Sequence, residues 1–118
     1  MGKRVKEFNE FRRKMNARIL AEDNRVIKRV FSVDSLTYTE GALSAKTKEL
    51  LGLTASMVLR CDDCVSYHLG QCVELGCSKE EIIEAMSVAL VVGGTIVIPH
   101  LRRAVAFLDE VTGAAPAE

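Results

Sequence analysis

Apolar residues recur at steps of three and four along most of this chain, and no segment alternates convincingly between apolar and polar over five residues. This spacing lines apolar side chains along one face of a helix, whereas a half-buried strand requires alternation. The sequence therefore predicts an all-α fold. The helices are expected at 5–21, at about 26–31 ending before the polar segment 32–41, and at 45–60, 63–75, 79–92 and 96–111.

Residues that start and stop helices support these boundaries. Asp23 and Ser44 are predicted N-caps of the second and third helices, because short polar side chains bond the first free backbone N–H groups. Ser78 and Glu81 form the pattern of a capping box. Gly76 suits a left-handed C-terminal cap.

The helix predicted at 79–92 is apolar nearly all round from Ile82 to Val92. Such a helix must be covered on every side, yet a domain of 118 residues buries only about two-thirds of its unfolded surface. The missing cover is expected from another subunit, so the chain is predicted to form a homo-oligomer.

The length of 118 residues predicts a single domain, 1–118, with a frayed tail at 113–118. The formal net charge is zero, but residues 1–30 form a basic arm with ten Lys or Arg and four Asp or Glu. These charges are spread along a helix, which is typical of a solvated face or of a docking surface for an acidic neighbour. No binding to nucleic acid is expected.

The N-terminus has no apolar run that would mark a signal peptide. The longest uncharged stretch, 85–101, has 17 residues, fewer than the roughly 20 that cross a bilayer. We expect a cytoplasmic protein without membrane contact. Four cysteines in that setting indicate redox chemistry, metal binding or burial rather than a disulfide framework.

Cys61, Cys64, His68 and Cys72 follow one another at steps of three, four and four, so a helix places them on one stripe. At a helix N-terminus the pKa of a cysteine falls from about 8.5 into the range of about 3.5 to 7.5. His68 lies one turn beyond Cys64 and is a candidate base for its thiol.

Glu49 is the candidate partner of this histidine. If the chain reverses near 59–62, the flanking helices form an antiparallel hairpin, and Glu49 then lies opposite 68–72. Its carboxylate can orient the imidazole of His68. The alternative is a surface ion pair between Glu49 and Lys46 or Lys48.

Zinc is the main alternative for the cysteines, with His100 and Cys77 as further ligands. Ligands on one helix stripe cannot surround a tetrahedral ion, so no metal is expected. Cys72 and Cys77 are predicted to be core residues, since free cysteines are usually buried. The chain has no motif for a flavin, haem or nicotinamide, and no cofactor is expected.

The order Glu49, eleven residues, Cys61-x-x-Cys64, three residues, His68 resembles the alkylhydroperoxidase D-like proteins of the carboxymuconolactone decarboxylase superfamily. The resemblance covers a core at roughly 43–110. It implies a bundle of about five to six helices, with a central hairpin that carries the cysteines, assembled as trimers or hexamers. It also implies a thiol-disulfide oxidoreductase or alkylhydroperoxidase activity, an antioxidant function of the peroxiredoxin type.

The same resemblance assigns roles to the site residues. Cys64 is the attacking thiol, Cys61 its disulfide partner, His68 the base and Glu49 the end of a proton relay. The substrate is a hydroperoxide or a disulfide, and electrons come from an external dithiol or redox protein. Asp63 replaces the histidine of alkylhydroperoxidase D proper, and a carboxylate there opposes thiolate formation.

Two other functions stay open. One is a lactone decarboxylase like the namesake of the superfamily, whose members generally lack the cysteine pair. The other is a non-catalytic oligomeric protein that binds a ligand or senses oxidants.

Overall fold

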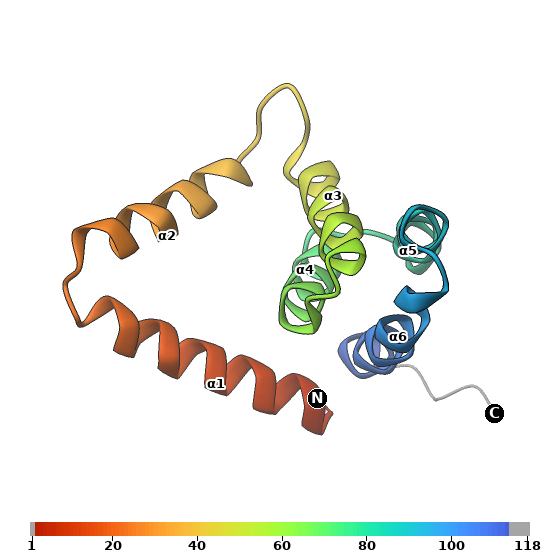
Figure 1. Cartoon of the computed structure of the whole chain (residues 1–118), viewed down its shortest axis with the longest axis horizontal. Helices are drawn as coiled ribbons and strands as arrows, with labels where there is room; N and C mark the ends of the chain where they lie inside the picture. The colour runs from red at the N-terminus through yellow and green to blue at the C-terminus, as the bar shows by residue number, and fades with distance from the viewer. Residues whose placement is uncertain (1, 114–118) are drawn as a thin grey trace.

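The computed structural model describes residues 2–113, and this part of the chain is helical without a β-strand (Figure 1). The all-α prediction is confirmed. No helix within this range has both the length and the apolar character needed to cross a membrane. The elements are α1 Lys3–Leu20, α2 Arg25–Thr37, α3 Ala45–Val58, α4 Asp62–Glu74, α5 Lys79–Gly93, the 3₁₀ turn η1 Thr95–Val97 and α6 Ile98–Thr112.

Three of the predicted caps are confirmed. The Ser44 side chain accepts a hydrogen bond from the backbone N–H of Thr47 at the start of α3. Ser78 and Glu81 form a capping box at the start of α5. Gly76 follows α4 with a φ of 85°, a conformation that glycine adopts without strain.

The prediction for α2 is wrong at both ends. Asn24, not Asp23, is the N-cap: its side chain accepts from the N–H groups of Val26 and Ile27. Asp23 instead has a φ of 56° and makes the turn that precedes the cap. The helix also continues through polar residues to Thr37, because neither glycine nor proline interrupts the chain before Gly41.

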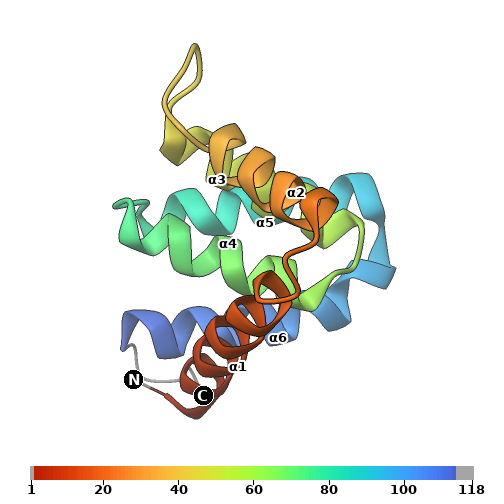
Figure 2. The same cartoon turned by 90° about the vertical axis from the view of Figure 1, so that its left-hand side faces the viewer.

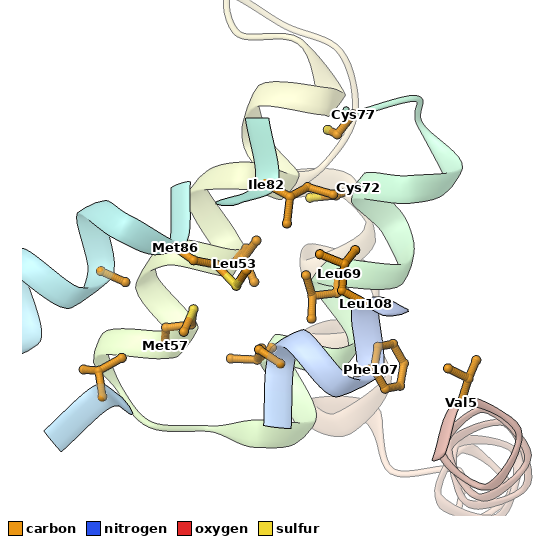
Figure 3. Packing of buried hydrophobic residues seen from close by; sticks show 14 residues of the cluster. Val5, Leu53, Met57, Leu69, Cys72, Cys77, Ile82, Met86, Phe107 and Leu108 are labelled. Atoms are coloured by element: carbon orange, nitrogen blue, oxygen red, sulfur yellow. The ribbon is translucent and has the colours of Figure 1, made fainter. Parts of the chain in front are cut away.

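The core lies between α3, α4, α5 and α6. α3 and α4 pack side by side along their length as the predicted hairpin (Figure 2). Their facing side chains include Leu53 and Met57 of α3 and Leu69 of α4 (Figure 3). Cys72 and Cys77 are buried in the same cluster, as predicted for core cysteines.

α1 and α2 extend along one side of this core (Figure 1). α1 is anchored on α6 by the buried Val5 and by an edge-to-face contact between Phe8 and Phe107, with ring centroids 5.7 Å apart. α2, which is described over its whole length, contributes no buried residue. This helix is therefore held only loosely by its own chain.

The apolar helix α5 is only half covered. Its inner face, Ile82, Met86 and Ala89, lies in the core. On the outer face Val88 is 53% and Val91 is 86% exposed. A single chain thus leaves part of α5 uncovered, as the sequence predicts.

Candidate functional site

Glu49 and His68 form the centre of the candidate site. Glu49 comes from α3 and His68 from α4, and their side chains meet with Oε2 and Nδ1 2.6 Å apart. Glu49 is 2% and His68 7% exposed, so water hardly weakens the interaction. The predicted approach of the two side chains is confirmed. The alternative partners are engaged elsewhere, Lys46 with Glu81 and Lys48 with the carbonyl oxygen of Thr39.

Gly52 makes room for the imidazole. It lies in α3, less than one turn after Glu49, and a Cβ atom there would stand 2.7 Å from Cε1 of His68. Real Cβ atoms essentially never approach another heavy atom so closely. A glycine inside a helix costs about 1 kcal/mol relative to alanine, and here it lets the ring lie against the backbone of α3.

Tyr38 lies at the other nitrogen of the imidazole. Its hydroxyl is 3.5 Å from Nε2 of His68, at the long end of hydrogen-bond distances. Burial, and then the Glu49 carboxylate, raise the pKa of Tyr38, so its hydroxyl stays protonated and can donate to Nε2. A neutral imidazole then donates from Nδ1 to Glu49, and Nε2 is the end that accepts a proton.

Sequence reasoning missed Tyr38, because it fell in the segment expected to be a loop. The signal that could have found it is the spacing Ile27, Phe31, Asp34, Tyr38, which continues one helix face if the helix is not stopped at Phe31.

Cys61 and Cys64 lie at the start of α4. Cys61 is the N-cap, and its Sγ accepts a hydrogen bond from the backbone N–H of Cys64 at 3.4 Å. Both are free thiols; Cys64 is exposed and Cys61 partly buried. The two sulfurs therefore lie close together in the first turn of α4.

The pKa of Cys64 moves opposite to the direction expected at a helix N-terminus. The hydrogen bond between its thiol and Cys61, followed by burial and by the charges of Cys61 and Asp63, raises this pKa to about 11. At pH 7 only about one Cys64 in ten thousand is then a thiolate. Near neutral pH the Cys64 thiol is therefore protonated in the reduced protein.

Among the described residues 2–113, the hydrogen-bond partners of the His68 ring are Glu49 and Tyr38, and Cys64 is not one of them. Cys64 and His68 instead line the same cavity of about 730 Å³ between α1, α2 and α4. The apolar part of the wall comes from α1, through Phe8, Phe11, Met15 and Ile19. The candidate base His68 and the Cys64 thiol therefore share a cavity without a direct hydrogen bond.

Asp62, between the two cysteines, ties this turn to α6. Its carboxylate accepts from Nδ1 of His100 at 2.8 Å and from Nε of Arg103 at 2.9 Å. Sequence reasoning missed this cluster, since Asp62 lies 38 positions before His100 and 41 before Arg103. It fixes the start of α4, and with it Cys61, against the core.

The ligand set considered for zinc is not brought together. His100 bonds Asp62, and Cys77 lies beside Cys72 in the core, away from the exposed Cys64. Within residues 2–113 no group of three or more His, Cys, Asp or Glu side chains is arranged to hold a metal ion. Burial raises the pKa of both Cys72 and Cys77, which keeps these two thiols protonated.

Solved structures share this fold. Two crystal structures of TM1620 from Thermotoga maritima match with TM-scores of 0.89 and 0.87 and identities of 57% and 56%. They cover 92% and 91% of this chain and 95% and 91% of the Thermotoga chain. One is described as a carboxymuconolactone decarboxylase family protein with a suggested part in an antioxidative response.

A more distant structure has the same fold. Apo-lpg0406 from Legionella pneumophila, of the carboxymuconolactone decarboxylase family, has a TM-score of 0.86 at 22% identity and covers 94% of this chain and 99% of its own.

Sequence comparison points the same way. An uncharacterised protein of the cox locus of Paracoccus denitrificans is 30% identical over 83 residues, which are 70% of this chain and 75% of that protein. The sequence pattern of the carboxymuconolactone decarboxylase family matches residues 26–107, a span that contains the hairpin, both cysteines and the Glu49–His68 pair. The chain belongs to the carboxymuconolactone decarboxylase family.

Proposed function

We propose that the protein is a thiol-disulfide oxidoreductase of the alkylhydroperoxidase type, an antioxidant enzyme that reduces hydroperoxides by cycling Cys61 and Cys64 between dithiol and disulfide. The observation that carries the proposal is the buried Glu49–His68 pair at 2.6 Å, whose histidine lines the same cavity as Cys64. A carboxylate, an imidazole and a thiol in that order form a proton relay to a nucleophile.

The first step converts Cys64 to a sulfenic acid. Its thiol proton passes to Nε2 of His68 across the cavity that both side chains line, while Glu49 stabilises the imidazolium that forms. The thiolate then attacks the terminal oxygen of the hydroperoxide. The O–O bond breaks, sulfur is oxidised, and the alkoxide takes a proton from His68 and leaves as an alcohol.

The second step closes the disulfide. The Cys61 thiol loses its proton and its sulfur attacks the sulfenic sulfur of Cys64. The S–S bond forms as the S–O bond breaks, and the hydroxide that leaves takes up one proton, equal to the one that Cys61 lost, and becomes water. An external dithiol or redox protein then reduces the disulfide by thiol exchange and restores both thiols. Electrons thus flow from the external dithiol to the peroxide.

The raised pKa of Cys64 explains why such a site needs a relay. A thiol whose pKa is about 11 is almost fully protonated in the cell, so its reaction depends on a neighbouring base. The antioxidative part suggested for the Thermotoga relative supports the same chemistry. The predicted cytoplasmic setting, where thiols are kept reduced, suits it as well.

The test is reduction of an organic hydroperoxide with a small dithiol in excess. Wild type is expected to consume peroxide and dithiol in equal amounts, whereas Cys64→Ser and Cys61→Ser lose turnover. The matched control is Cys77→Ser, a buried thiol outside the pair, which keeps it. Equal peroxide consumption by wild type and Cys64→Ser would remove the proposal and leave the lactone decarboxylase or a non-catalytic binding protein as the function.

The resemblance also implies a trimer or hexamer. That assembly is part of the proposal, since the half-covered α5 calls for another chain.

A further inference from the structure

Two helices of this chain expose outer stripes with the same spacing. Each stripe has two charged residues and then two apolar ones, at steps of four, four and three, and all eight are exposed. The α2 stripe is Arg25, Arg29, Val33 and Leu36, and the α5 stripe is Glu80, Glu84, Val88 and Val91.

The opposite face of each helix is turned toward its own chain. On α5 this face contains the buried Ile82 and Met86. On α2 it is continued by Tyr38, which reaches His68 directly after the helix, and includes Asp34, which lines the cavity. The outer stripes therefore point away from the molecule. α2 and α5 lie on opposite sides of the chain, with α3 and α4 between them (Figure 1), so the stripes cannot meet within one copy.

The stripes complement each other in charge. The first two positions are both basic on α2 and both acidic on α5. Within residues 2–113 none of these four charged side chains has an ion-pair partner. The apolar positions are strongly exposed, at 61% and 69% on α2 and 53% and 86% on α5. Neighbouring apolar side chains, Val30 and Val92, widen each patch.

We propose that α2 of one copy docks in parallel along α5 of a second copy. In this register Arg25 meets Glu80 and Arg29 meets Glu84. Val33 and Leu36 lie against Val88 and Val91 and leave water together with them. Parallel alignment is required, because an antiparallel one sets the charged half of each stripe against the apolar half of the other.

The contact joins two different surfaces, so every copy offers one stripe to each of two neighbours. Such a heterologous contact repeats around a ring if its rotation closes. The contact between α2 and α5 also affects the candidate site, since α2 contributes no buried residue to its own chain and is followed directly by Tyr38. A neighbouring α5 would hold α2 from outside and thereby keep the Tyr38 hydroxyl beside His68. The interface does not depend on the chemistry proposed for the cysteines.

A charge swap tests both the contact and its direction by light scattering at micromolar concentration. The variants are Arg25→Glu with Arg29→Glu, Glu80→Arg with Glu84→Arg, and the fourfold combination. We expect wild type and the fourfold variant to be oligomers of equal mass, and each double variant to fall to the 13.0 kDa monomer. Arg13→Glu with Lys14→Glu, an equal charge change on the exposed face of α1, should leave the assembly unchanged.

A second swap, Val33→Lys and Val88→Glu, should give the same pattern at the apolar positions: each alone dissociates the oligomer and the pair restores it. Circular dichroism should stay helical throughout, because all substituted side chains are exposed. A monomeric wild type, double variants that assemble like wild type, or failure of both combinations to reassemble would overturn the proposal.

Discussion

Replacing Gly52 with alanine tests whether the missing side chain at this position of α3 allows the His68 ring to lie where it does. The new Cβ would stand 2.7 Å from Cε1 of His68, whereas carbon atoms in contact are about 3.5 to 4.0 Å apart. The ring must therefore move away by about 1 Å. The distance from Nδ1 of His68 to Oε2 of Glu49, now 2.6 Å, then exceeds the range of a hydrogen bond.

The change in the free energy of unfolding is the balance between a lost hydrogen bond and an improved helix propensity. A hydrogen bond to a charged group contributes about 1.5 to 3 kcal/mol, and the buried Glu49 would be left without its partner. Alanine in a helix interior returns about 1 kcal/mol relative to glycine. Gly52→Ala is thus expected to lower the free energy of unfolding by about 0.5 to 2 kcal/mol. The relay, misplaced by about 1 Å, should slow the reaction of Cys64 about 100-fold.

Gly70→Ala is the matched control. It also replaces a helix-interior glycine, in α4, but its Cβ meets nothing within 4 Å. It should gain up to about 1 kcal/mol and leave the rate unchanged. Thermal unfolding at equal protein concentration and the rate of Cys64 alkylation measure the two effects. Equal stability and equal alkylation rates of Gly52→Ala and Gly70→Ala would show that His68 does not pack closely on α3.

Three further predictions concern the thiol. His68→Ala should slow Cys64 alkylation about 10²- to 10⁴-fold at neutral pH, and Glu49→Gln should slow it less. Both defects should shrink as the pH approaches the Cys64 pKa of about 11. Profiles of rate against pH that superimpose on wild type would make His68 a packing residue. Asp63→Asn removes a charge that raises this pKa, so alkylation at pH 8 should become faster, and an unchanged rate would show that the carboxylate does not reach the thiol. Because the pKa of Cys64 is raised on folding, the stability that this thiol contributes is present below about pH 8.5 and lost as pH rises toward 11. The free energies of unfolding of wild type and Cys64→Ser, measured in urea, should therefore converge across this window. A constant difference between them would contradict the raised pKa.

The parts of the fold set by local chemistry could be predicted from the sequence. Ser44, Ser78 and Gly76 act on backbone groups within a few residues of themselves, and the structure has all three caps as expected. The facing of Glu49 and His68 was also predictable, because a short reversal between two helices sets their register.

Other features depend on contacts that sequence spacing does not contain. The polar residues from Ser32 onward predict the end of a helix, yet α2 continues through them to Thr37, because Ser, Asp and Thr disfavour a helix only weakly and no glycine or proline lies among them. Tyr38 was missed as a consequence. The Asp62, His100 and Arg103 cluster joins α4 to α6 through side-chain hydrogen bonds between distant parts of the sequence. The raised pKa of Cys64 likewise reflects a sulfur neighbour that outweighs the helix terminus.

The proposed function requires that Cys61 and Cys64 form one reversible redox pair. Its most direct measurement is to treat the reduced protein with one equivalent of an organic hydroperoxide and to locate the disulfide by peptide mapping. We expect a bridge between Cys61 and Cys64, one alcohol formed per bridge, and Cys72 and Cys77 still reduced. Four free thiols after treatment, or a bridge that includes Cys72, would contradict it.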